Sequence, residues 1–187
     1  MNRLGWLVLT GLFAVGVLVV WTPEHSPPAN GTAPASGHAP AAAGPLRIPV
    51  VGVMADRLVD TWRQSRDDGA RVHQAIDIPA PLGTPVVAAM AGRIEKLFHS
   101  NAGGTTAYIR SADGRWLTYY AHLSAYVPGL AEGQSVAVGE KIGFVGDSGN
   151  AGAGNTHLHF ALHRMAPGES WYQGTPVNPY PYLAEKL

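Results

Sequence analysis

Short β-rich runs separated by turns that contain glycine or proline fill the chain from Arg47 onward, and this pattern limits the fold more than any other feature. The clearest run is 105-TTAYIRSADGRWLTYYAHL-123, where two β-prone arms flank Asp113-Gly114, a dipeptide suited to turns that need positive φ. Only 55-ADRLVDTWRQ-64 fits a helical pattern, and weakly. We expect an all-β domain of small antiparallel sheets, packed as a sandwich or half-barrel with long loops. Further strands are predicted within 72–78, 84–90, 92–99, 135–146 and 157–163.

Residues 1–21 have the composition of a membrane segment. Arg3 is followed by 4-LGWLVLTGLFAVGVLVVW-21, eighteen residues without a charge, which is the lower limit for a helix that spans a bilayer. A cleavable signal peptide is the alternative, but this apolar run is longer than usual and 22-TPEHSP-27 offers no small-x-small cleavage site. We therefore expect an uncleaved anchor with its N-terminus in the cytoplasm and the rest of the chain outside.

Residues 22–46 read as a linker. They are rich in proline, alanine and glycine and contain almost no large apolar side chain, so they cannot form a core. Proline-rich segments extend by about 3.1 Å per residue, which gives this segment a reach of roughly 70–80 Å. The expected organisation is an anchor at 1–21, a linker at 22–46 and one globular domain at 47–187.

The composition excludes several kinds of site. The chain has no cysteine, so a disulfide, a thiolate metal ligand, a cysteine nucleophile and a lipidated cysteine are all ruled out. Its formal net charge is zero and it has no run of lysine or arginine, which argues against a nucleic-acid partner. Any bound metal must therefore be held by histidine and carboxylate side chains.

Two histidines separated by one residue lie in 155-NTHLHFAL-162. On a strand, residues i and i+2 share a face, so His157 and His159 face one way, roughly 7 Å apart, while Leu158 and Phe160 face the other. The apolar face requires a core. A half-exposed strand with polar residues outward would give the same pattern, so the rest of the chain has to decide what the two imidazoles do.

Three more candidate residues precede this pair. His73 and Asp77 are four residues apart in 72-VHQAIDI-78, which reads as a strand with both on one face, and His122 closes the predicted hairpin. A catalytic zinc keeps three protein ligands and one open position, and accepts imidazole and carboxylate ligands. His73, Asp77 and one histidine of the pair would supply such a set. His122 and the other paired histidine would then be free for proton transfer or oxyanion stabilisation.

Five motifs occur in a fixed order along the domain: 73-HQAID-77, 83-GTPVVAAMAGRI-94, 119-YYAHL-123, 146-GDSGNAGAG-154 and 157-HLHF-160. In this order they resemble the lysostaphin-type zinc metallopeptidases, whose module is also called the LytM domain and which cut peptide cross-links in bacterial cell walls. The similarity extends over roughly residues 52–183. It is the combination of the motifs that is specific, because each piece alone is common.

The resemblance implies roles for five residues. His73, Asp77 and His159 would bind zinc, and His122 and His157 would form the catalytic pair. Spacing alone does not say which histidine of the His157/His159 pair is the ligand. Many members have Gly-Pro before the two histidines and an acidic residue after the following phenylalanine. This chain has Asn155-Thr156 and Ala161 at those positions, and neither change replaces a ligand.

The resemblance also implies a function. We expect an endopeptidase with one zinc ion that hydrolyses the peptide part of bacterial peptidoglycan, held by residues 4–21 on the outer side of a membrane, in the periplasm. The alternative is a non-catalytic wall-binding or regulatory module on the same fold, but such members typically lose zinc ligands and all five positions are present here. His163 shares the face of His157 and His159, and we expect it at a solvent-exposed strand end.

Overall fold

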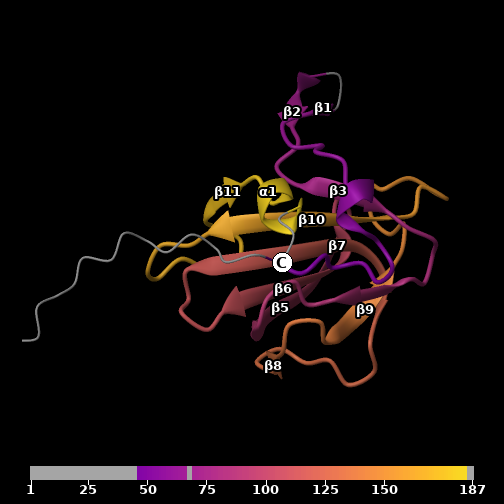
Figure 1. The fold of residues 1–187 in the computed structure, drawn as a ribbon. Coiled ribbons are helices and arrows are strands. Elements are labelled where there is room, and N and C mark those ends of the chain that lie inside the picture. Colours follow the sequence, from indigo (N-terminus) through magenta and orange to yellow (C-terminus); the bar gives the residue numbers. More distant parts are fainter. Residues whose placement is uncertain (1–45, 67–68, 185–187) are drawn as a thin grey trace, which may run out of the picture. The chain divides into compact units, whose positions relative to one another are not determined.

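The computed structural model describes residues 46–66 and 69–184. The expected anchor at 1–21 and the linker at 22–46, except its last residue, lie outside the described residues. Within the described ranges, no helix is long and apolar enough to cross a membrane. Regular structure in these ranges is almost entirely antiparallel β-strand (Figure 1).

Of the eleven strands in this part of the chain, nine belong to one sheet and the other two, β1 and β2, pair with each other. The all-β class is confirmed, but the strands form one nine-stranded sheet where several small sheets were expected. The strands are β1 (Ser65–Arg66), β2 (Arg71–Val72), β3 (Ile76–Pro79), β4 (Pro85–Val87), β5 (Gly92–Ser100), β6 (Gly104–Ser111), β7 (Trp116–Tyr126), β8 (Ser135–Val136), β9 (Lys141–Val145), β10 (His157–Arg164) and β11 (Thr175–Val177). The helices are the short 3₁₀ helix η1 (Ala55–Arg57) and α1 (Tyr180–Ala184).

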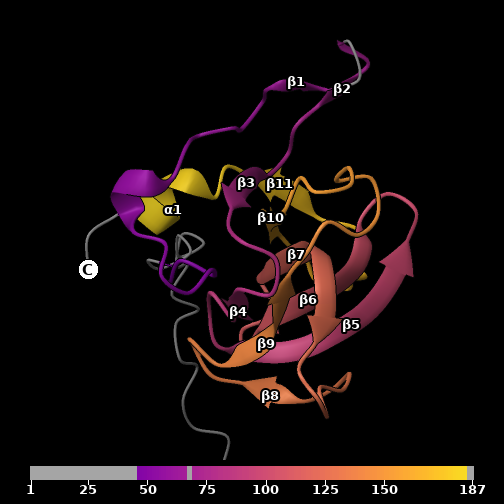
Figure 2. The ribbon, with the colours of Figure 1, turned by 90° about the vertical axis from the view of Figure 1, so that its right-hand side faces the viewer.

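The hairpin of β6 and β7 is the centre of the sheet. Its turn contains Gly114 at φ 72°, as the Asp-Gly dipeptide predicts. β7 pairs with β6 along one edge, and its other edge is shared by β10, over Trp116–Ala121, and β9, over Leu123–Tyr126. Register shifts in β5, β6 and β7 bend the strands, and the sheet is strongly curved (Figure 2).

β10 has the two faces that its sequence predicts. Leu158, Phe160 and Leu162 are fully buried in the core, and His157 and His159 lie on the opposite face. One edge of β10 pairs with β7, and the other edge is shared by β3 and β11. Both edges of β10 are therefore covered, which holds the two histidines on a rigid support.

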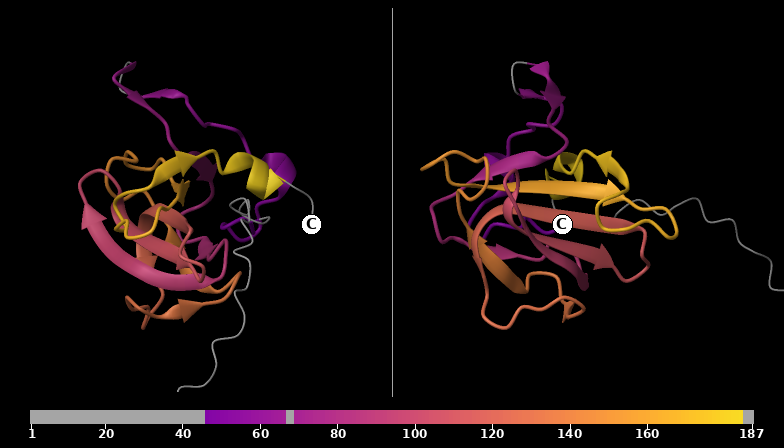
Figure 3. Two further views of the ribbon diagram at one scale, coloured as in Figure 1. Left: turned by 90° about the vertical axis from the view of Figure 1, so that its left-hand side faces the viewer. Right: turned by 180° about the vertical axis from the view of Figure 1, so that it is seen from behind.

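Two expectations about residues 55–78 are wrong. The predicted helix at 55–64 is limited to η1, because the chain turns to an extended conformation at Leu58. The segment after it instead bonds to the strand region: Arg63 N–H donates to His73 O at 2.8 Å and His73 N–H donates to Gln64 O at 2.9 Å. The predicted strand at 72–78 is interrupted between β2 and β3, where His73 makes these two backbone hydrogen bonds. η1 lies beside α1, at the C-terminal end of the described chain (Figure 3).

Tyr120 connects the core to the backbone of a neighbouring segment. Its side chain is fully buried, and its ring contacts Phe160 edge-on with a centroid distance of 5.3 Å. Its hydroxyl accepts a hydrogen bond of 2.8 Å from the backbone N–H of Ala89, which is also buried. The hydroxyl therefore satisfies a donor that cannot reach water.

We expect Tyr120→Phe to lower the free energy of unfolding by about 1–3 kcal/mol, because it leaves the buried Ala89 N–H without an acceptor. The measurement is urea denaturation followed by circular dichroism. Tyr172→Phe is the matched control, since that side chain is 69% exposed and should change stability little. Equal unfolding midpoints for the two variants would contradict the role given to the Tyr120 hydroxyl.

Candidate metal centre

Asp77 and His159 are brought together by the pairing of β3 with β10. The two strands are antiparallel, and their register places Asp77 directly opposite His159. Directly opposed residues on one face of an antiparallel pair have their side chains in contact distance. Because Ile76 and Ile78 are fully buried beneath the sheet, Asp77 between them must point to the face that carries His159.

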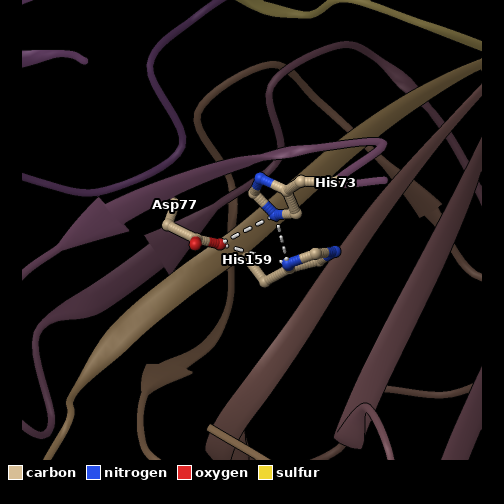
Figure 4. A group of neighbouring side chains, drawn as sticks. All are labelled: His73, Asp77 and His159. Atoms are coloured by element: carbon tan, nitrogen blue, oxygen red, sulfur yellow. Dashed lines mark hydrogen bonds and ion pairs between the residues drawn. The ribbon is translucent and has the colours of Figure 1, made fainter. Parts of the chain in front are cut away.

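His73 reaches the same place from outside the sheet. It lies between β2 and β3, and its backbone is bonded to Arg63 and Gln64. Its side chain is 4% exposed and points toward Asp77 and His159 (Figure 4). The sequence placed His73 and Asp77 on one face of a single strand. They do meet, but through a turn in the chain and not through strand periodicity.

Three atoms of these residues form a nearly equilateral triangle. Nε2 of His73 lies 3.1 Å from Nδ1 of His159, and Oδ1 of Asp77 lies 3.2 Å from the first and 3.1 Å from the second (Figure 4). Ligand atoms around a tetrahedral zinc ion, with bonds of 2.0–2.2 Å, are about 3.4 Å apart. The triangle is therefore close to the size that a zinc ion requires.

The chemistry of the three atoms also fits a cation. Nδ1 of His73 lies 2.8 Å from the carbonyl oxygen of Thr61, which only accepts, so Nδ1 donates there and Nε2 is the ring nitrogen left for a cation. The carboxylate oxygen of Asp77 has no proton to share with it. Electron-rich atoms at such short separations require a proton or a metal ion between them, and a His₂Asp set without thiolates is one that zinc accepts.

Asp77 is held from two sides. Its backbone N–H donates to Oγ1 of Thr61 at 3.0 Å, and its Oδ2 is ion-paired with Nη2 of Arg66, which leaves Oδ1 for the triangle. Burial raises the pKa of Asp77, but the hydrogen bonds and charges of His159 and His73 outweigh burial and hold that pKa well below its usual value. The carboxyl is therefore ionised, as a metal ligand must be.

Two more imidazoles, those of His122 and His157, lie beside the triangle. Their ring centroids are 4.9 Å apart, and the His122 ring is 5.6 Å from that of His159. Nδ1 of His122 lies 2.8 Å from the carbonyl of Ser148, and Nδ1 of His157 lies 2.8 Å from that of Asn155. Because a carbonyl only accepts, each Nδ1 donates to its carbonyl, and each Nε2 is the ring nitrogen left for the cleft.

His122 has a backbone that few histidines adopt. Its φ is 61°, and it sits in β7 at the point where the partner strand changes from β10 to β9. This conformation costs energy for a residue other than glycine and indicates a position that the surrounding structure determines. Burial, together with the neighbouring imidazoles, lowers the pKa of His122 to about 4, so its ring is neutral at neutral pH and can accept a proton.

The loop before β10 holds His122 in place through Ser148. The Ser148 hydroxyl donates to Leu123 O at 2.8 Å and accepts from Thr105 N at 3.0 Å, while its carbonyl binds the His122 ring. The loop can come this close to β6 only because residue 149 is a glycine: a Cβ on Gly149 would lie 2.3 Å from the backbone nitrogen of Gly104. Ser148 is thus locked to two strands at once.

The five residues lie at an open cleft of about 560 Å³. Its lining includes Arg66, Arg71 and Val72 of the β1–β2 hairpin and several aromatic side chains. His163 also borders this cleft. It is half-buried, its Nδ1 lies 3.3 Å from the carbonyl of Gln173, and burial lowers its pKa. The expectation of a solvent-exposed strand end for His163 is therefore wrong.

The five residues predicted from the sequence lie together at one cleft, but the residues that orient them were not predicted. Thr61, Arg66 and Ser148 are separated from their partners by many residues, and no spacing rule connects them. Ser148 lies within 146-GDSGNAGAG-154, whose glycines were the available signal. No sequence pattern marked Thr61 or Arg66 as part of the site.

Comparison with known proteins agrees with the fold and the cluster. The model of "Peptidase family M23" matches residues 71–179. The L-Ala–D-Glu endopeptidase of Bacillus subtilis is 33% identical over 129 residues, covering 66% of this chain and 38% of that protein. The DD-carboxypeptidase/endopeptidase Mpg of Neisseria meningitidis is 42% identical over 122 residues, covering 65% and 23%. The chain thus spans less than two fifths of the length of either relative.

Among solved structures, the catalytic domain of the antimicrobial peptidase lysostaphin from Staphylococcus simulans is similar. It superimposes with a TM-score of 0.53 and 29% identity, covering 68% of this chain and 90% of that domain. The fold and the His₂Asp cluster together are those of a lysostaphin-like domain. The chain belongs to peptidase family M23.

Arg66 provides a test of how the cluster is oriented. We expect Arg66→Ala to weaken zinc binding by about 10- to 100-fold, because the partners of a ligand fix its direction and ionisation. The measurement is a competition titration of zinc against a chromophoric chelator.

Arg115→Ala is the matched control, because Arg115 pairs with Asp113 in the exposed β6–β7 turn. Arg66→Lys should lie between wild type and Arg66→Ala, since it keeps the charge but loses the planar guanidinium. Equal zinc affinity in wild type and Arg66→Ala would show that Asp77 does not depend on this contact.

Proposed function

We propose that this chain is a zinc-dependent endopeptidase that hydrolyses the peptide cross-links of bacterial peptidoglycan in cell-wall remodelling. The observation that carries the proposal is the convergence of three ligand atoms, 3.1–3.2 Å apart, beside two imidazoles held by backbone carbonyls at an open cleft. The names of similar proteins support the substrate class, since one of them is the peptidoglycan DD-endopeptidase ShyC of Vibrio cholerae.

His73, Asp77 and His159 would hold one zinc ion, through Nε2, Oδ1 and Nδ1 respectively. Bound there, the ion would supply an open coordination position, lower the pKa of a water molecule toward 7 and polarise the scissile carbonyl. The open cleft above the triangle gives a peptide access to that position. Three protein ligands and one free position are the arrangement of a catalytic zinc site and not of a structural one.

His122 and His157 would handle the proton and the developing charge. Each has one ring nitrogen fixed by a backbone carbonyl, so each presents the other nitrogen to the cleft in a fixed direction. One of the two would accept the proton of the attacking water on its Nε2, and the other, with a proton already on Nε2, would donate a hydrogen bond to the oxyanion that forms on the carbonyl. Holding both rings by the backbone means that neither has to reorient during the reaction.

Alanine variants should separate binding from catalysis. We expect His73→Ala, Asp77→Ala and His159→Ala to lose most of the zinc, which is about one ion per chain in the wild type. We expect His122→Ala and His157→Ala to keep the zinc but lower hydrolysis by roughly 10²- to 10⁴-fold. Zinc is measured by elemental analysis and hydrolysis by mass spectrometry of digested, purified peptidoglycan, on the same preparations.

His99→Ala is the control, because His99 is an exposed histidine of β5 that does not border the cleft. Loss of zinc in His157→Ala but not in His159→Ala would reverse the assignment of this pair. Zinc binding without any hydrolysis of peptidoglycan by the wild type would favour the non-catalytic wall-binding module instead.

We further propose that residues 4–21 anchor the protein in a membrane and that residues 22–46 tether the domain outside the cytoplasm, in the periplasm. The proposal rests on the eighteen uncharged residues and the Pro/Ala-rich composition that follows them. The mature protein is then expected to keep its N-terminus and to remain with membranes after washing at high salt. A mature N-terminus within 22–46, found by peptide sequencing, would overturn the anchor.

A further inference from the structure

Five aromatic side chains form a continuous wall on one side of the cleft. We call Phe98, Tyr108, Tyr119, Trp171 and Tyr172 the aromatic wall. The Trp171 ring contacts those of Tyr108, Phe98 and Tyr172 with centroid distances of 4.9, 5.2 and 5.4 Å. Tyr108 in turn contacts Tyr119 at 4.6 Å. The wall is therefore one surface and not a set of isolated side chains.

The wall begins at the metal centre. The Tyr119 ring is 6.0 Å from that of His159, and four of the five rings border the cleft, Phe98 being the exception. Several remain open to solvent: Tyr172 is 69% exposed and Phe98 is 41% exposed. Large exposed aromatic groups next to a reaction centre are typical of a binding surface, because a soluble domain gains nothing from leaving them uncovered.

The segment that carries Trp171 is held firmly against the sheet. Nη2 of Arg110, on β6, donates to the carbonyl of Glu169 at 3.0 Å, and the same guanidinium is paired with Glu95 of β5. At the other end, Nδ1 of His163 lies 3.3 Å from the carbonyl of Gln173. These contacts pre-organise the wall, so a ligand does not have to order it.

The half-buried His163 connects β10 to the segment that carries Trp171. It is not part of the metal centre, although it shares the face of His157 and His159. Through Gln173 it fixes the segment that carries Trp171 and Tyr172 to β10, the strand that also carries His159. β10 therefore connects the segment that carries Trp171 and Tyr172 to His159.

The chemistry of the wall fits an uncharged ring with a polar rim. The wall contains no acidic or basic side chain, and its rings carry hydroxyl and indole N–H groups at their edges. Tyr108 and Tyr119 carry hydroxyl groups that can both donate and accept hydrogen bonds. A sugar ring has an apolar face of C–H groups and a rim of hydroxyls, which matches such a surface.

The distances allow a sugar to lie on the wall while a peptide lies at the metal centre. Three ring-to-ring steps, of 6.0, 4.6 and 4.9 Å, lead from His159 to Trp171. An extended peptide advances about 3.3 Å per residue, so about five residues at most cover that path. A saccharide joined to a short peptide could therefore contact both places at once.

We propose that the aromatic wall is a saccharide subsite, which binds the sugar that carries the peptide while the peptide is cleaved at the metal centre. This inference rests on the proposed function for its substrate class. It adds that the glycan end of peptidoglycan is recognised, with Trp171 as the main contact, and that sugar-bearing peptides are preferred over free ones.

The experiment compares two substrates with the same cross-linked peptide. One is a cross-linked fragment that keeps its sugars, made by digesting the glycan strands. The other is the same fragment after an amidase has removed the sugars. Wild-type full-length protein should have a higher kcat/KM on the sugar-bearing form. Trp171→Ala should lower that value by about two- to tenfold and leave the value for the free peptide nearly unchanged.

Three controls make the result specific. Trp171→Phe should retain most of the preference, because it keeps a ring. Val138→Ala truncates an exposed apolar side chain that does not border the cleft and should change neither value. Unchanged zinc content and melting temperature of Trp171→Ala would show that the metal centre and the fold are intact.

A binding measurement separates this inference from the proposed function. Isothermal titration of an N-acetylated glycan oligosaccharide without peptide should give heat with wild type and less with Trp171→Ala, whether or not hydrolysis occurs. The inference is overturned if Trp171→Ala lowers kcat/KM equally on both substrates, because the wall would then contact the peptide. It is also overturned if the variant changes neither substrate and the oligosaccharide does not bind.

Discussion

The antiparallel pairing of β3 with β10 is the interaction on which the rest of the site depends. Its register sets Asp77 opposite His159 on one face and, on the other, buries Ile78 opposite Leu158 in the core. A slip of one residue would exchange the two faces and bring Leu158 to the metal centre. The burial of the apolar side chains therefore holds the register, and the register holds the two ligand atoms together.

Backbone carbonyls set the direction of the other imidazoles. His73, His122 and His157 each have Nδ1 at 2.8 Å from a carbonyl oxygen, and each presents Nε2 to the cleft. These carbonyls belong to Thr61, Ser148 and Asn155, and all three residues lie in loops outside the strands. The strands bring the rings close together, and the loops decide which nitrogen of each ring faces the ligand.

The lining of the cleft combines two kinds of side chain. The β1–β2 hairpin, which projects from the sheet in Figure 1, contributes Arg66, whose guanidinium holds Asp77. Four rings of the aromatic wall also line the cleft, and Arg110 and His163 contact the segment that carries Trp171. Arg66 thus serves the metal centre, whereas the aromatic rings offer an apolar surface to a ligand.

The sequence by itself determined the strand-rich fold and the two faces of β10, because strand periodicity and turn chemistry are local properties. The order of its motifs, and not periodicity, singled out the five clustered residues. It placed the Asp113-Gly114 turn correctly. Only the tertiary structure decided how His73 reaches Asp77, why His122 adopts positive φ, and that Thr61, Arg66 and Ser148 orient the site. Those features arise from contacts between segments distant in the chain. Such contacts depend on the path of the whole sheet, which no local pattern encodes.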